Sequence, residues 1–531
     1  MIRINQVKLP VEHTTEALHK KVQELLKYKG SMDVEIVKRS LDARKKPQLF
    51  YVYMLDVTIP EKEERKLLKR CRGSQIQKVE PVKYVFPVKH YEGQKRPVIV
   101  GMGPAGLFCG YVLAKAGFRP ILLERGKCVE ERSRDVEAFW KTGHLNTESN
   151  VQFGEGGAGT FSDGKLNTLI KDKYGRNKEV LRIFVKHGAP KEILYDYKPH
   201  IGTDILKKIV RSMREEILAS GGDVRFETRV TDLLIADGRI KGLVLNGQEE
   251  LLAEHVVLAL GHSARDTFSM LLKQKIVMEP KPFAIGMRVE HPQELINLSQ
   301  YGKKEAGALG NAIYKLTTET SEKRGVYTFC MCPGGYVVAA ASEEGRLAVN
   351  GMSEHARDGR NANSALLVQI FPEDFGSDHP LAGMLFQREL EEKAFLAGGG
   401  SYTAPVQTVG SFLGKGKVEA AEVTATYRPA VRESSLDEIF PAFMTEALRE
   451  ALPAMGRKLK GFDRADAVLT AVESRSSSPI RILRDKTGMS LCKQGIYPAG
   501  EGAGYAGGIV SAAVDGIFVA EKIAEKYGWM K

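Results

Sequence analysis

A glycine-rich turn between an apolar strand and a helix of small residues most constrains how this chain can fold. The short strand at 97–100 runs into Gly101-x-Gly103-x-x-Gly106, and a helical stretch follows. The first glycine permits the tight turn, the second lets backbone approach a pyrophosphate, and the third lets the helix pack closely on the strand. The spacing therefore predicts a dinucleotide-binding turn at one edge of a parallel sheet.

A second apolar run ends on an acidic residue at the distance that ribose recognition requires. Glu124 closes the run at 121–123, about 20 residues after the turn. A carboxylate there can bind the ribose hydroxyls, while the free N–H groups that begin the preceding helix face the phosphates. In this region we expect the cofactor to contact Gly101, Gly103, Pro104, Ala105, Gly106, Glu124, Arg125 and Arg132.

The C-terminal end of the chain indicates which dinucleotide is bound. A strand end leads into Gly500-Glu501-Gly502, a second glycine-rich turn and a helix that begins without charge. This element resembles the second flavin motif of the glutathione-reductase-type flavoproteins, and the run at 256–261 resembles their third element. In that superfamily the helix N-terminus stabilises negative charge at the N1/O2 edge of the flavin. The resemblance implies FAD, held here by Gly261, Gly500, Glu501, Gly507, Gly508 and Ile509.

Two further strings carry a closer resemblance. GEGGAGTFSDGKLNT at 154–168 and GHSARD at 261–266 are similar to a family of uncharacterised bacterial FAD-dependent dehydrogenases or oxidoreductases. Membership would imply the cofactor and the fold, and it names no substrate.

The glycines of 150–165 are too dense for the interior of a helix or strand, so we expect a loop that approaches the cofactor. Lys165, at its end, either places a cation near the flavin N1/O2 edge, binds an anionic substrate, or is an ordinary surface lysine. The strand expected at 223–232 should place Val230 near the adenine, and a three-stranded meander with turns at 237–238 and 246–247 should follow it. The loop residues expected near the flavin are Gly156, Gly157, Gly159, Ser162 and Asp163.

Candidates for catalysis are weaker than those for cofactor binding. Lys165, His262 and Arg265 are the polar residues that we expect to assist the chemistry, although His262 also suits a turn residue that bonds backbone. Cys330 and Cys332 lie two apart in a strand pattern, near the upper limit of separation for a disulfide, and we expect no redox role for them. We find no cysteine or histidine spacing typical of a metal site.

The positive charge of the chain is concentrated at its N-terminus. Residues 1–90 hold 20 Lys and Arg against 11 Asp and Glu, which leaves little net charge for the rest of a chain of formal net charge +12. Their periodicities predict a βαββαβ ferredoxin-like unit whose last strand is 83–86, followed by a linker at 87–96. Its basic face suits RNA, an acidic protein or an anionic substrate, or is simply a solvated surface.

Length and composition limit the remaining choices. A chain of 531 residues is too long for one hydrophobic core. No apolar run approaches a membrane span, the N-terminus lacks the apolar core of a signal peptide, and six cysteines do not form a disulfide framework. We therefore expect a cytoplasmic protein.

Together these patterns predict an α/β fold with a Rossmann-like FAD-binding domain, an inserted β-rich (α+β) substrate domain and a small N-terminal ferredoxin-like domain. The expected segments are an N-terminal domain at 1–90, the first part of the FAD domain at 96–280, the insertion at 281–469 and the C-terminal part of the FAD domain at 470–531.

Two functions are consistent with this organisation. The first is an FAD-dependent oxidoreductase that passes hydride through flavin N5 to or from a small molecule. NAD(P)H would serve it only as a transient reductant, because we find no second GxGxxG motif that follows an apolar strand in the middle of the chain. The alternative is a flavin-dependent RNA-modifying or RNA-binding protein that holds RNA with residues 1–90.

Overall fold

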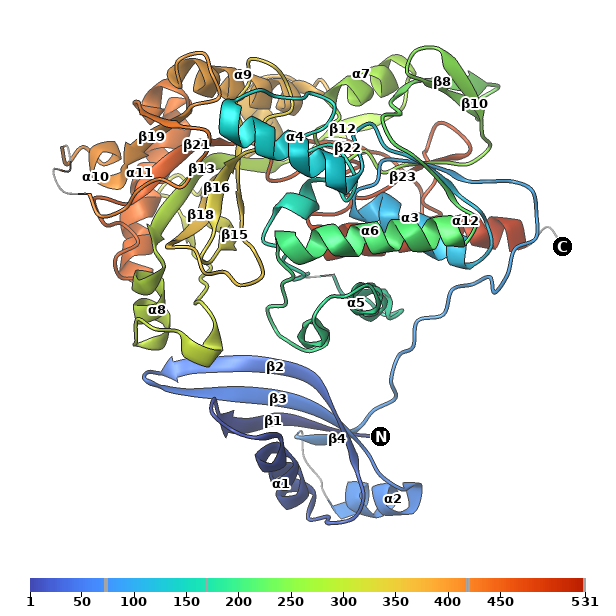
Figure 1. Cartoon of the computed structure of the whole chain (residues 1–531), viewed down its shortest axis with the longest axis vertical. Helices are drawn as coiled ribbons and strands as arrows, with labels where there is room; N and C mark the ends of the chain where they lie inside the picture. Colours follow the sequence, from blue (N-terminus) through green and yellow to red (C-terminus); the bar gives the residue numbers. More distant parts are fainter. Residues whose placement is uncertain (71–74, 169, 417, 419–420, 529–531) are drawn as a thin grey trace.

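The computed structural model describes residues 1–528 apart from 71–74, 169, 417 and 419–420. A small N-terminal unit lies at one end of a much larger body, and an extended segment joins the two (Figure 1). Among the described residues, no helix has both the length and the apolar character that crossing a membrane would demand.

The N-terminal unit is an antiparallel sheet with two helices. Its strands lie in the order β2-β3-β1-β4, and Leu18, Val22 and Leu26 of α1 bury their side chains against it. The elements are β1 (Ile2–Pro10), α1 (Thr15–Leu26), β2 (Asp33–Lys45), β3 (Gln48–Thr58), α2 (Glu61–Arg70) and β4 (Ile76–Lys78).

The predicted last strand of this unit is wrong. Residues 83–86 form no strand, and β4 lies at Ile76–Lys78 instead. Tyr84 and Phe86 pack against the hydrophobic core of the larger body. This apolar stretch is therefore part of the larger body and does not pair with β1.

The edge strand β2 docks the N-terminal unit onto the body. The backbone N–H of Arg39 donates to the carbonyl of Tyr195 at 2.8 Å, and the N–H of Tyr197 donates back at 2.9 Å. The Arg39 guanidinium also grips the Asp196 carboxylate at 2.7 and 3.0 Å. The contact covers part of an edge that would otherwise expose unpaired backbone groups.

A five-stranded parallel sheet forms the centre of the body, in the order β23-β11-β5-β6-β7. Its strands are β5 (Val98–Val100), β6 (Ile121–Leu123), β7 (Asp223–Arg225), β11 (Val256–Leu258) and β23 (Ile496–Pro498). One face is covered by α3 (Pro104–Lys115), α5 (Arg176–Lys186), α6 (Thr203–Ala219) and α12 (Ile509–Gly528), which share one hydrophobic core.

The chain then leaves the parallel sheet earlier than the sequence suggested. The expected strand at 223–232 is two strands, because β7 ends before Glu227, which has a positive φ of 51°. A three-stranded meander covers the other face with α7 (Arg265–Lys273), and its two predicted turns, at 237–238 and 246–247, are confirmed by positive φ angles. Its strands are β8 (Val230–Ala236), β9 (Arg239–Leu245) and β10 (Glu249–Leu252).

The inserted region is built on a seven-stranded mixed sheet in the order β14-β15-β18-β13-β21-β19-β20. These strands are β13 (Phe283–Pro292), β14 (Thr317–Glu319), β15 (Gly325–Cys332), β18 (Asn361–Ile370), β19 (Ala404–Thr408), β20 (Val431–Glu433) and β21 (Val468–Glu473). The surrounding elements are α4 (Val129–Thr142), α8 (Gln293–Tyr301), α9 (Ala382–Ala397), α10 (Val409–Phe412), α11 (Ala442–Lys458) and the hairpin β16 (Tyr336–Ala339) and β17 (Val349–Met352).

The structure moves one predicted boundary. A division at residue 470 would cut through β21, which is paired with β13 and β19 in the seven-stranded sheet. The chain returns through β22 (Ile480–Ile482), which pairs with β12 (Met278–Pro280) beside the parallel sheet. The two sheets are therefore joined by one two-stranded ribbon, in which β12 comes before the insertion and β22 follows it.

Candidate functional site

A cavity of about 430 Å³ lies between the parallel sheet and the seven-stranded sheet. Residues at or just beyond the carboxyl ends of β5, β6, β11 and β23 line it, among them Val100, Leu123, Ala259 and Ala499. In open parallel sheets ligands bind at this edge, where crossovers leave in opposite directions. From the predicted cofactor contacts, the cavity is lined by Gly101, Gly103, Pro104, Ala105, Glu124, Arg125, Gly157, Gly159, Ser162, Asp163, Val230, Gly261, Glu501, Gly507, Gly508 and Ile509.

The start of α3 forms a wall made of backbone. Gly101 has a φ of +98°, and a Cβ there would lie 2.3 Å from the carbonyl oxygen of Ala259. A Cβ on Gly106 would lie 1.9 Å from the carbonyl oxygen of Gly101, so Gly106 packs within the turn and does not line the cavity. Gly103 caps the helix without any side-chain hydrogen bond, which leaves the N–H groups of the first turn free for an anion.

Glu124 ties this wall together. Its carboxylate accepts hydrogen bonds from the backbone N–H groups of Met102 at 2.9 Å, Gly126 at 3.0 Å and Gly154 at 2.9 Å. A carboxylate offers about four acceptor positions. One position therefore remains for a ribose hydroxyl, and most of the carboxylate has a structural role that the motif does not reveal.

Two predicted arginine contacts have different positions. Arg125 lines the cavity, with its guanidinium over the ring of Phe153 at 4.1 Å. Arg132 does not line it: the side chain is fully buried and donates to backbone carbonyls of the glycine loop, including Asn150 at 2.8 Å and Glu155 at 2.7 Å. Burial lowers the pKa of Arg132 to about 10. Arg132 therefore shapes the loop and is no cofactor contact.

The glycine loop approaches the start of α3 closely. A Cβ on Gly157 would lie 2.8 Å from the Cα of Gly103, so Gly157 has no room for a side chain at this contact. Gly156 lies behind this contact and does not line the cavity, because its φ of +81° turns it toward Thr160.

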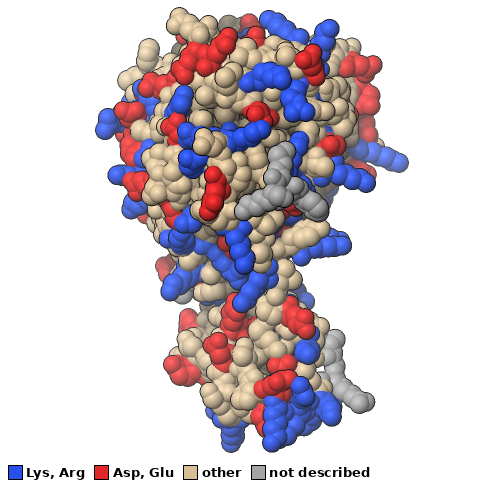
Figure 2. Space-filling view, turned by 90° about the vertical axis from the view of Figure 1, so that its right-hand side faces the viewer, with Lys and Arg blue, Asp and Glu red and all other residues tan. Residues whose placement is uncertain are grey.

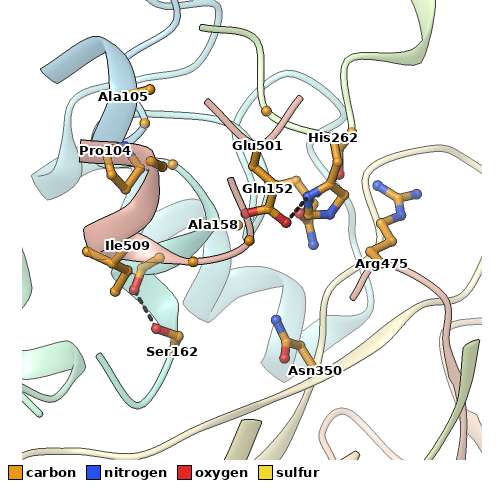
Figure 3. A pocket seen from close by; sticks show the side chains of 18 of the residues that line it. Pro104, Ala105, Gln152, Ala158, Ser162, His262, Asn350, Arg475, Glu501 and Ile509 are labelled. Carbon is orange, nitrogen blue, oxygen red and sulfur yellow. Dashed lines mark hydrogen bonds and ion pairs between the residues drawn. The ribbon is translucent and has the colours of Figure 1, made fainter. Parts of the chain in front are cut away.

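The second backbone wall is the start of α12. Ile509 begins this helix and faces Pro104 and Ala105 at the start of α3 across the cavity end shown in Figure 3. Gly500 does not line the cavity, since its N–H donates to Asp515 at 2.7 Å and a Cβ on it would lie 2.6 Å from the Cβ of Ala105.

His262 points into the cavity from the turn after β11, where Figure 3 shows it facing Glu501. Its Nδ1 lies 3.2 Å from Oε1 of Glu501, and its side chain is 10% exposed. Its Nε2 is buried without a hydrogen-bond partner among the described residues. The expected alternative, a turn histidine that bonds backbone, is not what the structure shows.

Lys165 also lines the cavity and carries a buried polar atom without a hydrogen bond. Its Nζ is buried without a hydrogen bond and lies 3.4 Å from Asp163. The Asp163 carboxylate is already engaged by Arg357 at 2.9 and 2.5 Å and by the hydroxyl of Ser353 at 2.5 Å. Burial would raise the pKa of Asp163, but the charges of Lys165 and Arg357 outweigh it and lower the pKa.

Arg265 is outside the cavity, which does not support the predicted catalytic role. Its guanidinium is buried and binds the carboxylate of Glu391 at 2.7 and 2.8 Å and that of Glu343 at 2.5 Å. Arg475 binds the same Glu391 at 3.0 Å and does line the cavity. Sequence reasoning therefore missed the arginine that lines the cavity at this point, because no local motif marks it.

The wall opposite the glycine turns is made of side chains from the insertion. Asn350, Glu473 and Arg475 line it together with Cys330 and Cys332. The strand β15 loses its register between Phe329 and Cys332, and Cys330 has a φ of +39°. No sequence pattern predicted this irregularity, which places Cys330 at the cavity.

Neither cysteine is poised as a thiolate. Burial raises the pKa of Cys330 to about 12 and also raises that of Cys332. The Cys332 thiol donates to the carbonyl of Cys330 at 3.2 Å, and Arg288 donates to the same carbonyl at 2.9 Å. These bonds hold the strained backbone in place.

The residues present fit a dinucleotide cofactor. An uncapped helix start, two backbones in van der Waals contact and a carboxylate with one free acceptor position meet at one end of the cavity. At the other end, the buried Nε2 of His262 and Nζ of Lys165 lack partners that a ligand would supply.

Comparison with protein families gives two matches. Residues 282–476 match a family described as FAD-dependent protein, C-terminal domain-like, and residues 1–58 match a domain of unknown function. An uncharacterized protein of Clostridium beijerinckii is 48% identical over 534 residues, covering 99% of each chain.

Solved structures with a similar arrangement are more distant. Glycine oxidase from Bacillus cereus is 11% identical with a TM-score of 0.31, covering 82% of this chain and 96% of its own. L-proline dehydrogenase from P. horikoshii is 13% identical with a TM-score of 0.33, covering 82% and 94%. Scores this low carry no conclusion about the chemistry of this chain.

Proposed function

We propose that this chain, which belongs to the same family as the Clostridium beijerinckii protein, is an FAD-dependent oxidoreductase that acts on a small molecule. The match of residues 282–476 to FAD-dependent proteins supports the cofactor. The observation that carries the proposal is one cavity shared by two uncharged helix starts and by a wall of polar side chains.

The cofactor assignment uses the residues that face the cavity. Gly101, Gly103 and Gly157 would hold the pyrophosphate at the start of α3, since only backbone without side chains leaves the space. Glu124 would bind one ribose hydroxyl, and Val230 would lie near the adenine. The start of α12 with Gly507 and Gly508 would stabilise negative charge on the isoalloxazine.

When bound, FAD supplies hydride transfer at N5 of the isoalloxazine. The chain supplies position and a proton. Because Glu501 holds Nδ1 of His262, the ring is oriented with Nε2 toward the cavity, where it can give or take a proton from a substrate atom. The insertion closes the opposite side and excludes water from the reacting atoms.

The domain organisation remains part of the proposal. We assign residues 1–78 to an N-terminal domain, 96–280 and 477–531 to the FAD domain, and 281–476 to the substrate domain. The last boundary follows β21 and the family match.

We do not propose RNA as a partner. Tyr53, an aromatic residue of the N-terminal unit that could stack on a base, is 4% exposed, and Arg39 is held by Asp196. Figure 2 shows acidic and basic side chains interspersed over the small unit. Likewise no observation supports a site for NAD(P)H.

The test is the visible spectrum of the purified protein. We expect yellow protein with a flavin absorbance band at about 450 nm, which anaerobic addition of a reductant bleaches. Gly103→Val should abolish the band while the ligand-free proteins unfold at the same temperature, because a Cβ on Gly103 meets only the Cα of Gly157, at 3.9 Å. Wild-type protein that stays colourless after reconstitution with excess FAD would overturn the proposal.

A further inference from the structure

The substrate side of the cavity carries lysines whose charge is not fully compensated by acidic residues. Lys165, Lys198 and Lys315 all line it. Neither Lys198 nor Lys315 forms an ion pair or hydrogen bond with any residue that the structure describes, and Lys165 lies only near the saturated Asp163.

Two of these lysines are brought together by backbone pairing. Lys165 forms an isolated bridge with His200, and the N–H of Leu166 donates to the carbonyl of Pro199 at 3.0 Å. Lys198 therefore begins the segment that runs beside Lys165. Burial lowers the pKa of Lys198, and no carboxylate offsets that effect.

Lys315 approaches from the seven-stranded sheet. The N–H of Thr328 in β15 donates to the carbonyl of the neighbouring Leu316, and the N–H of Leu316 donates to the Thr328 hydroxyl, which places Lys315 beside the irregular stretch that holds Cys330. The charge of Lys165 reaches the same stretch: burial raises the pKa of Cys330, and Lys165 partly counters that rise. Lys165 and Lys315 thus lie near the same stretch of the cavity wall, and Lys198 lies beside Lys165.

The acidic residues of the cavity cannot neutralise these lysines, because each is already engaged. Asp163 binds Arg357, Glu473 binds Arg288 at 3.0 Å and Glu501 faces His262. Glu124 accepts from backbone N–H groups at the other end. An uncompensated positive potential in a partly closed cavity attracts and orients an anionic ligand.

We propose that the substrate of this oxidoreductase is a small anion whose carboxylate or phosphate group is held by Lys165, Lys198 and Lys315. The inference rests on the proposed function and deepens it. Asn350 adds a neutral donor: its Oδ1 accepts from the N–H of Gly351 at 2.8 Å, and Figure 3 shows its side chain turned into the cavity.

The experiment measures binding without turnover. Acetate, inorganic phosphate and neutral acetamide are titrated into the FAD-loaded protein, and the dissociation constant is read from the change in the flavin spectrum and from calorimetry. We expect saturable binding of acetate or phosphate and none of acetamide; which anion binds more tightly identifies the group on the substrate.

Lysine variants locate the binding group. Lys165→Gln should weaken anion binding about tenfold or more, since it removes a desolvated charge-assisted bond. Lys165→Arg should restore much of the binding. Lys198→Gln and Lys315→Gln should each weaken it about threefold, because both side chains keep contact with solvent, which screens their charges. Lys486→Gln, an exposed lysine outside the cavity, is the matched control and should change nothing.

The outcomes separate this inference from the proposed function. Yellow protein that binds neither anion, binds acetamide equally well, or keeps full anion affinity in Lys165→Gln overturns the inference and leaves the flavoprotein assignment intact. Loss of FAD in Lys165→Gln would assign the lysine to the cofactor and also overturns it. Wild-type protein that holds no FAD overturns both.

Discussion

The two ends of the cavity are built from different materials. The end at α3 and α12 consists of backbone: glycines without room for a Cβ and helix starts with free N–H groups. The end at the seven-stranded sheet consists of side chains that lie far apart in the sequence, such as Lys165, Asn350 and Arg475. A backbone site needs a short motif, whereas a side-chain site needs a completed fold.

The same contrast holds one layer deeper. Behind the backbone end, Arg132 and Glu124 bind main-chain groups and stabilise loops. Behind the side-chain end, Arg265 and Arg475 share the buried carboxylate of Glu391. The first support depends on close packing of backbone, and the second depends on balanced buried charge.

The largest effect should come from Gly106→Ala. Its Cβ would lie 1.9 Å from the carbonyl oxygen of Gly101, so the turn and the helix must separate. We expect ligand-free protein that is destabilised by roughly 3 kcal/mol and that retains no FAD, as measured by thermal unfolding and by the visible band. Gly103→Val is the contrast, with FAD lost and stability kept. Equal stability of both variants would contradict a role for Gly106 in packing.

Glu391→Gln tests the charge balance at the other end. Burial opposes ionisation, but Arg265 and Arg475 outweigh it and lower the pKa of Glu391. The neutral variant leaves the buried guanidinium groups with less counter-charge, which should cost about 3 kcal/mol in the free energy of unfolding in urea. Glu389→Gln, on the same helix but 58% exposed, is the control. An equally small loss in both would argue against the network.

Glu155 should make the glycine loop sensitive to pH. It is fully buried, and burial raises its pKa to about 7 from the ordinary 4.5. Between these values the folded protein binds the proton more tightly than the unfolded chain, so stability falls as pH rises through this window and is constant above it. The total change is on the order of 3 kcal/mol.

Glu155→Gln should abolish this dependence, seen in urea unfolding at about pH 5 and about pH 7.5. Glu131→Gln, at an exposed position nearby, should retain it. A variant with an unchanged pH profile would assign the dependence to another group.

The smallest effect is expected away from both ends. Arg39→Ala removes the pair with Asp196, whose side chains are 27% and 30% exposed, and should cost about 1 kcal/mol or less. FAD absorbance and anion binding should be unchanged. Faster proteolysis of the segment between the two units is the expected signature, and altered FAD content would show that docking reaches the cavity.

Much of the architecture could be predicted because its signals are local. The helix α3, the amphipathic helix α6 and the turns of the meander follow from glycine spacing, apolar periodicity and turn residues. The strand expected at 83–86 failed because its aromatic residues bury themselves in another domain, which no local pattern reports. The boundary at 470 failed for a similar reason: pairing of β21 with β13 and β19 decides it.

The order of residues by itself determined where backbone must come close to backbone, since a glycine's missing Cβ is a property of the residue. Only the tertiary structure decided which side chains share the cavity. Arg475 lines the cavity and Arg265 does not, although both bind Glu391. It also left Lys165 without a sufficient counter-charge by giving Asp163 to Arg357. Charge compensation depends on distance in space, and that distance exists only after the sheets have packed.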